Sequence, residues 1–335
     1  MVEVIRVGLD TSKHVFQVHG VDGSECVVVR RQLSRGQVEK FFAGLAPALV
    51  GLEACGASHH WARVLRALGH RVQLVPPQYV KAYVKRGKND RIDAAAICEA
   101  MSRPGMRFVP VKSEGEQAAA MLLGVRDLLV KQRTMLVNAI RSHAAEFGVI
   151  GAKGVSRVSD VLARARESVP KLAFDLLAVL AGQLEVLEVQ LGRIDRQLRD
   201  WHRENERSSR LATMPGIGPV GAMTMVLRVP DPAVFRSGRH FASWIGLTPR
   251  EHSTAGKQRL GKISRQGDEA LRRLLVVGAT SVIKQAQRGR GPAWLLALLR
   301  RRPAKVVAVA LANKMARIAW AMMVSGQAYR ARQAS

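Results

Sequence analysis

The spacing of apolar residues changes near Gly115, and this change limits the possible folds more than any other feature of the sequence. Before it, residues 4–10, 14–19 and 26–33 are short runs rich in β-branched residues, separated by turn residues. After it, apolar residues recur at every third or fourth position, which is the period of a helix. The sequence therefore predicts an α/β part followed by an α-helical part.

The first part begins with three strands in a row and then alternates. The three runs predict a meander, after which we expect a helix over 34–45, a strand over 48–53, a helix near 58–68 and a strand over 72–75. Alternating strands and helices add parallel strands to a sheet. We therefore predict an α/β domain over residues 1–112.

Long helices are predicted from about residue 115 to 201. On the second of them the apolar residues follow a nearly heptad spacing: Leu177, Leu180, Leu184, Leu187, Leu191, Ile194 and Leu198. Charged residues fill the other faces, which is typical of an antiparallel hairpin or coiled coil. We predict a coiled-coil arm over 113–205 and an α-helical domain over 206–335. Such an arm is either plain core or a dimerisation surface, and its spacing favours neither.

The chain is strongly basic. Its 53 Lys and Arg residues against 26 Asp and Glu residues give a formal net charge of +27. This excess repels itself unless a polyanion neutralises it, so nucleic acid is the expected partner. No apolar run reaches the length of about 18 residues that suggests a membrane span, and the most apolar stretch, 306–324, contains Lys314 and Arg317. Because the N-terminal residues also lack a cationic leader, we expect a cytoplasmic protein.

The cysteines show no metal or disulfide pattern. Cys26, Cys55 and Cys98 are widely spaced and include no CxxC pair. The histidines form no HExxH motif. Any metal ion is therefore expected to have oxygen ligands.

Four carboxylates are candidates for that role. Asp10 ends the first predicted strand and Glu53 the fourth, and open α/β sheets place their sites at such carboxyl ends. Asp90 and Asp93 lie three apart in KNDRIDA, residues 88–94, and share one face of the helix that begins there. Taken singly, each acid is explained as a turn or helix cap. Together they are the set that a ribonuclease H-like fold needs for two Mg²⁺ ions.

Basic residues surround these acids. We predict phosphate contacts from Lys13, Lys85, Lys88 and Arg91. The alternative is that these basic residues only form a solvent-exposed surface and bind nothing.

Two features stand out in the last domain. Residues 215–221, PGIGPVG, are typical of a helix-hairpin-helix turn, in which Gly216 and Gly218 would bring backbone N–H groups close to a phosphate. The alternative is a tight turn between two helices. Residues 250–259 form a basic segment that contains Ser253, which on local grounds is an ordinary turn residue.

These motifs resemble a known family. The GLDTSK motif around Asp10, the strand ending at Glu53 and above all KNDRIDA are similar to the DEDD transposases of the insertion-sequence one-hundred-and-ten family and to the related Piv DNA invertases. Further similar segments, in the family's C-terminal transposase domain, are residues 215–218, 241–249, 252–257 and 263–272. The resemblance covers nearly the whole chain and is least specific in the central helices.

The resemblance implies a ribonuclease H-like (RuvC-like) domain, a helical arm and an α-helical transposase domain. It implies Mg²⁺ bound by Asp10, Glu53, Asp90 and Asp93. It also implies that Ser253 attacks a DNA phosphate and forms a phosphoserine link, with Lys257 and Arg259 neutralising that phosphate. The implied partners are DNA, a structured guide RNA and further copies of the chain, as a dimer or tetramer.

Two other functions are compatible with the motifs. A RuvC-like nuclease that cuts Holliday junctions would use the acids with water and would not need Ser253. A non-catalytic nucleic-acid-binding protein would use the acids only as caps. Replacing Ser253 and the acids distinguishes these three functions.

Overall fold

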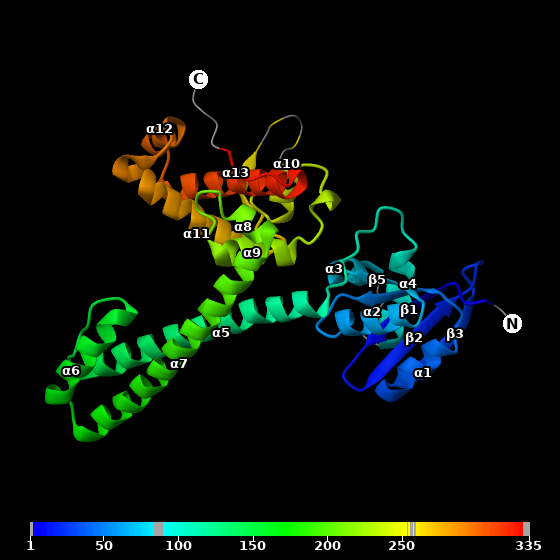
Figure 1. Ribbon diagram of the computed structural model, residues 1–335, viewed down its shortest axis with the longest axis horizontal. Helices are drawn as coiled ribbons and strands as arrows, with labels where there is room; N and C mark the ends of the chain where they lie inside the picture. Colours follow the sequence, from blue (N-terminus) through cyan, green and yellow to red (C-terminus); the bar gives the residue numbers. More distant parts are fainter. Residues whose placement is uncertain (1–2, 84–89, 253, 255–256, 258, 331–335) are drawn as a thin grey trace. The chain divides into compact units, whose positions relative to one another are not determined.

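The computed structural model describes residues 3–83, 90–252, 254, 257 and 259–330, and the side chains of Asp90, Arg91 and Arg290 lie outside the described part. Packing divides the chain into two compact units, Met1–Glu116 and Gln117–Ser335. The predicted mixture of an α/β region and a mostly helical C-terminal region is confirmed (Figure 1). The predicted boundary at residues 205 and 206, inside the second unit, stays a prediction.

The first unit contains a five-stranded sheet with the order β3-β2-β1-β4-β5. Strands β1 (Arg6–Thr11), β2 (Val15–Val21) and β3 (Val27–Ser34) form the predicted antiparallel meander. Strands β4 (Leu49–Glu53) and β5 (Arg71–Val75) continue the sheet in parallel on the other side of β1. Short turns suffice to join antiparallel strands, whereas the parallel strands need helical crossovers.

Helices lie against both faces of this sheet. α1 (Val38–Ala43) and α2 (Ser58–Ala67) bury Phe42, Trp61 and Leu65 in a core with Leu9 and Leu52. The opposite face of β1 and β4 carries α4 (Asp90–Met101), which follows the short helix α3 (Pro77–Val80) and the 3-10 turn Lys81–Tyr83. Because side chains alternate along a strand, neighbouring residues of β1 face opposite sides of the sheet, one toward α1 and α2 and the next toward α4.

A pair of long helices forms an arm in the second unit (Figure 1). In α7 (Lys171–Glu204) every seventh residue is buried, at Leu177, Leu184, Leu191 and Leu198. The first two pack against α5 (Glu114–Glu146) in a core that also includes α6 (Val158–Ser168). Ion pairs join Arg126 to Asp195 at 2.6 Å and Arg133 to Glu188 at 3.5 Å. The heptad prediction of an antiparallel helical hairpin is confirmed.

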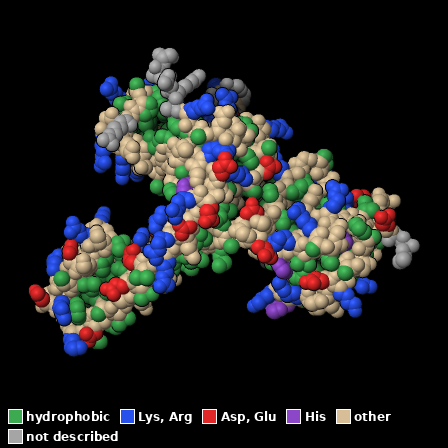
Figure 2. Space-filling model, viewed as in Figure 1, with side chains coloured by type: hydrophobic (Ala, Val, Ile, Leu, Met, Phe, Trp, Pro, Cys, Tyr) green, Lys and Arg blue, Asp and Glu red, His purple; other side chains and the backbone are tan. Residues whose placement is uncertain are grey.

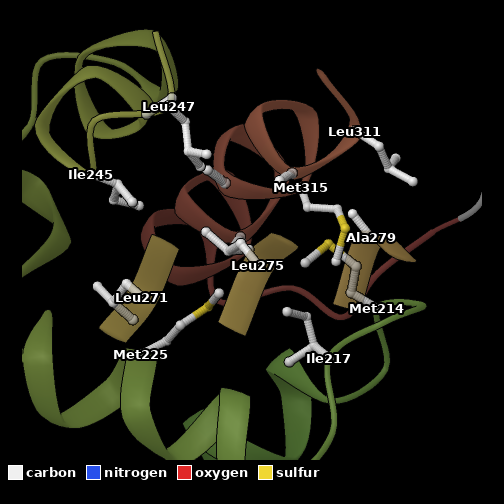
Figure 3. Close-up of a cluster of buried hydrophobic side chains, with 14 of the residues drawn as sticks. Met214, Ile217, Met225, Ile245, Leu247, Leu271, Leu275, Ala279, Leu311 and Met315 are labelled. Atoms are coloured by element: carbon white, nitrogen blue, oxygen red, sulfur yellow. The ribbon is translucent and has the colours of Figure 1, made fainter. Parts of the chain in front are cut away.

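The rest of the second unit is a helical core. Its helices are α8 (Glu206–Leu211), α9 (Pro219–Arg228), α10 (Gly238–Trp244), α11 (Glu269–Gln285), α12 (Ala293–Arg301) and α13 (Ala304–Ser325). Figure 3 shows Leu275 and Ala279 of α11 beside Met315 of α13, with Ile217 and Met225 closing the cluster. A short hairpin of β6 (Pro249–Glu251) and β7 (Leu260–Ile263) interrupts the helices.

Helix α13 has the length and hydropathy of a membrane span, and among the described residues it is the one helix that does. Its side chains nevertheless contribute to the core, with Val307, Leu311, Met315 and Met322 all buried. The apolar stretch 306–324 is therefore part of a helix that packs in the core of the second unit.

Candidate active site

Asp10 and Glu53 lie at the carboxyl ends of two neighbouring parallel strands. The register of β1 and β4 places Leu9 opposite Leu52, so the next residue on each strand is an acid. Neighbouring strands are about 4.8 Å apart. The two carboxylates therefore share one edge of the sheet, which we call the acidic edge.

Helix α4 reaches the acidic edge because two glycines leave room for it. A Cβ added at Gly8 would lie 2.0 Å from the carbonyl oxygen of Ala94, and one added at Gly51 would lie 2.1 Å from Sδ of Met101. Gly8 and Gly51 are opposite each other, and each precedes its acid by two residues, on the same face of the sheet. The helix is thus in direct contact with that face, and Asp93 comes immediately before the contact at Ala94.

The carboxyl group of Glu53 is influenced by Asp93. Burial raises the pKa of Glu53 above its usual range, the negative charge of Asp93 raises it further, and the nearby Lys81 acts in the opposite direction. A divalent cation close to both carboxylates would remove this mutual repulsion. The electrostatics of the pair therefore fit a bound cation.

Three elements place a carboxylate at the acidic edge that could serve as an oxygen ligand: Asp10 from β1, Glu53 from β4 and Asp93 from α4. Within the described ranges, no three His, Cys, Asp or Glu side chains are close enough together to hold a metal ion. The side chain of the fourth predicted ligand, Asp90, lies outside the described part. The residues fit a hard cation in type and in backbone position, and their side chains must turn toward a common point to bind it.

A groove of about 1080 Å³ is lined by Gln17 of β2 and by Ile92 and Ala94, the residues on either side of Asp93. Its floor is formed by β2 and β3, where Gln17, the neighbour of Asp10 in the sheet, donates a hydrogen bond to Gln32 at 3.2 Å. His19 also lies on the floor, and burial followed by the charge of Arg30 lowers its pKa. The groove therefore offers hydrogen-bonding groups together with both basic and acidic side chains.

The predicted phosphate-binding cations are only partly described. Lys13 is exposed in the turn after β1, three residues beyond Asp10. Lys85, Lys88 and the side chain of Arg91 lie outside the described residues. Their role stays a prediction.

The PGIGPVG turn packs tightly against α11. Gly216 has a φ of +85°, and a Cβ there would lie 2.7 Å from the carbonyl oxygen of Gly278. A Cβ at Gly278 would in turn lie 2.1 Å from the oxygen of Gly216. The alternative of a tight turn between helices is therefore sufficient to explain Gly216. Phosphate contact stays a prediction, with Gly218 exposed at the start of α9.

Ser253 lies outside the described residues, and its neighbours belong to the β6–β7 hairpin. The backbone N–H of His252 donates to the carbonyl oxygen of Arg259 at 2.9 Å, and that of Lys257 donates to Thr254 at 3.0 Å. Lys257 and Arg259 are exposed. The two predicted cations of the serine motif thus occupy the hairpin.

The base of the hairpin is held by residues that the sequence did not indicate. Arg272 of α11 donates hydrogen bonds from Nη1 to the carbonyl oxygens of Ile245 and Gln266, both at 2.8 Å. Asn313 of α13 donates from Nδ2 to Leu247 at 3.2 Å. Residues 263–272 were named only for their resemblance to the transposase family, and their local sequence carries no signal for these long-range bonds.

An α/β domain with acids at its strand ends, in a chain with a basic helical part, is typical of enzymes that act on DNA phosphodiesters. A model of the IS110-type DEDD transposases matches residues 7–148, and a model described as "Transposase IS116/IS110/IS902 family" matches residues 208–292. The fold and these matches define a DNA transposase with a DEDD catalytic domain.

Relatives extend the similarity to almost the full length. The chain is 54% identical to "Putative transposase y4pF/y4sB" of Sinorhizobium fredii, over 98% of this chain and 86% of the relative. It is 37% identical to "Transposase for insertion sequence element IS1111A" of Coxiella burnetii, over 98% and 92%. A "Pilin gene-inverting protein" of Moraxella bovis is 26% identical over 79% and 75%. The chain belongs to the IS110 family of insertion-sequence transposases.

Proposed function

We propose that this transposase cuts and rejoins the DNA of its insertion sequence with Mg²⁺ at the acidic edge and Ser253 as nucleophile. The observation that carries the proposal is the meeting of β1, β4 and α4, which brings Asp93 close enough to Glu53 to raise its pKa. DEDD transposase domains typically use divalent metal ions. The strand order and the position of α4 support a ribonuclease H-like (RuvC-like) fold for this domain.

The carboxylates and the serine have different roles in the proposed reaction. Asp10, Glu53, Asp90 and Asp93 would hold Mg²⁺, which supplies charge stabilisation to phosphoryl transfer when bound. Oγ of Ser253 forms a bond to phosphorus as the bond to one ester oxygen breaks, and the serine proton ends on the released DNA hydroxyl. Attack by a second DNA hydroxyl reverses this step and frees the serine. Because the phosphoserine link keeps the bond energy, rejoining needs no ATP.

Lys257 and Arg259 would assist that step from the hairpin. Both side chains are exposed, so a DNA phosphate can approach them. Hydrogen bonds from cations to phosphate are about twice as strong as those between neutral groups.

Replacement of the serine tests this mechanism. We expect Ser253→Ala to abolish the covalent protein–DNA adduct on a denaturing gel, using labelled element ends, Mg²⁺ and the RNA transcribed from the flanking DNA. Ser264→Ala, which changes the other hydroxyl of the region, should keep the adduct. If Ser253→Ala still cut and rejoined DNA, the acids would be acting with water, as in a junction nuclease.

A structured guide RNA is part of the proposal. Its support is the net charge of +27, which suits RNA as well as DNA, together with the family resemblance. Purification from cells carrying the whole element, with the bound RNA sequenced, should recover one transcript from the element's flank.

Transposases are normally cytosolic, and we place this one in the cytoplasm.

We also propose that the chain works as a homo-oligomer, a dimer or tetramer joined through its arm. A groove of about 520 Å³ on the arm is lined by Met135 and Val186, which are 69% and 61% exposed. Figure 2 shows hydrophobic side chains along this part of the surface. Exposed apolar patches of this kind mark contact surfaces. Light scattering should give a multiple of the chain mass, which Met135→Lys should reduce.

A further inference from the structure

The C-terminal stretch of the chain contains no carboxylate side chain. Residues 270–335 include 13 Lys and Arg residues and not one Asp or Glu, so they supply 13 of the 27 net positive charges. The preceding 269 residues contain 40 Lys and Arg residues and 26 Asp and Glu residues, and along α7 the two kinds are interspersed. The stretch therefore has no internal means of neutralising its charge.

Four of these cations cluster where α12 ends and α13 begins. Arg300 and Arg301 form the last turn of α12, Arg302 is its C-cap and Lys305 lies in the first turn of α13. All four are exposed. We call them the α12 basic surface. Among the described residues, no ion pair joins any of them to a carboxylate, and Figure 2 shows Lys and Arg side chains over this end of the helical core.

The other end of α12 adds an aromatic group and a fifth cation. Trp294 is 42% exposed, and Nζ of Lys314 lies 3.8 Å from the centre of its ring. A nine-residue helix is about 13 Å long, so positive charge and one aromatic ring extend over that length. Double-stranded DNA carries one negative charge per about 1.7 Å of its axis. The surface is thus long enough to meet several phosphates.

We propose that the α12 basic surface binds the backbone of duplex DNA outside the phosphates that react. The inference rests on the proposed action on DNA and adds a place where the DNA is held. The surface suits duplex rather than single-stranded nucleic acid. Its guanidinium groups lie at one rigid helix end and can bind phosphates. Binding of single strands also uses several aromatic side chains on which the unstacked bases stack, and this surface has one. We name DNA rather than RNA because the chain belongs to a family of DNA transposases.

Binding of the full-length protein to a labelled DNA duplex of unrelated sequence tests the inference. We expect the triple variant Arg300→Gln, Arg301→Gln, Arg302→Gln to weaken binding by about tenfold or more, and to reduce the slope of log Kd against log salt concentration by up to about 2.7, or about 0.9 per lost phosphate contact. The matched control changes three exposed arginines of α7, with Arg193→Gln, Arg196→Gln and Arg199→Gln. It removes equal charge and should leave the slope nearly unchanged.

Further results decide the outcome. The charge-preserving triple Arg300→Lys, Arg301→Lys, Arg302→Lys should restore the slope, and circular dichroism should show all variants folded. Equal loss in the α12 and α7 variants would overturn the inference, because net charge alone would then explain binding. A defect for duplex RNA without one for duplex DNA would also overturn it. Failure of wild-type protein to bind any DNA would instead contradict the proposed function itself.

Discussion

At the acidic edge, Gly8 leaves no room for a side chain between β1 and Ala94 of α4. A Cβ at Gly8 meets a backbone oxygen at 2.0 Å, and that oxygen cannot turn aside as a side chain can. We therefore expect Gly8→Ala to push α4 outward and to lower the free energy of unfolding by about 1–3 kcal/mol, the usual cost of overpacking. Urea unfolding measures this. Gly36→Ala, where a Cβ meets nothing within 4 Å, should cost little, and equal losses would contradict the packing.

Glu53 makes stability depend on pH. Because its pKa is raised in the folded protein, first by burial and then by Asp93, its favourable contribution is fully present below the unfolded pKa and is lost as pH rises through the folded pKa. We expect wild type, in EDTA, to lose stability relative to Glu53→Gln as the pH rises from acidic to neutral. Thermal unfolding across that range measures the difference, which Mg²⁺ should reduce. Parallel curves for the two proteins would contradict the assignment.

The residue patterns predicted the acids but not how they meet. Asp10 and Glu53 follow apolar strands, so their place at the strand ends was evident from local sequence. The approach of Asp93 depends on Gly8 and Gly51 facing α4 across a long sequence separation. Local spacing contains no information on such a contact. For the same reason Gly216 was indistinguishable from a phosphate-binding glycine.

At the scale of elements, the β6–β7 hairpin depends on Arg272. This side chain donates to two carbonyl oxygens at the hairpin base, and hydrogen bonds from charged groups contribute about 1.5–3 kcal/mol each. We expect Arg272→Ala to destabilise the protein by at least the contribution of one of these two bonds, about 1.5–3 kcal/mol, and to reduce adduct formation at Ser253. The control is Arg273→Ala, which breaks only an exposed pair with Asp127 at 3.1 Å, worth about 1 kcal/mol or less. Equal effects of the two variants on adduct yield would contradict a positioning role.

Elements differed in how well their sequence predicted them. The arm was evident because Leu177, Leu184, Leu191 and Leu198 repeat at seven residues and are all buried. The hairpin was missed because its strands are only three and four residues long and almost wholly exposed. An exposed strand has no alternation of buried and solvated residues, and alternation is the main signal for strands.

At the scale of the whole molecule, charged residues are distributed unevenly along the chain. The acidic edge gathers carboxylates within a protein of net charge +27, while the last 66 residues lack carboxylates altogether. Composition predicted a nucleic-acid partner, yet the location of the α12 basic surface required the structure, since exposure and ion pairing decide which cations are available. The proposed metal site and the proposed DNA-binding surface would thus consist of side chains of opposite charge.

We propose the acidic edge as the metal-dependent cleavage site of the transposase. The most direct measurement is Mg²⁺-dependent strand cleavage by Asp93→Asn beside Glu99→Gln, a control on the same helix whose carboxylate pairs with Arg103 at 2.6 Å. We predict that Asp93→Asn loses about 100-fold or more in cleavage rate, corresponding to about 2.7 kcal/mol of transition-state stabilisation, and still binds DNA, whereas Glu99→Gln cleaves normally. Normal cleavage by Asp93→Asn would contradict the account.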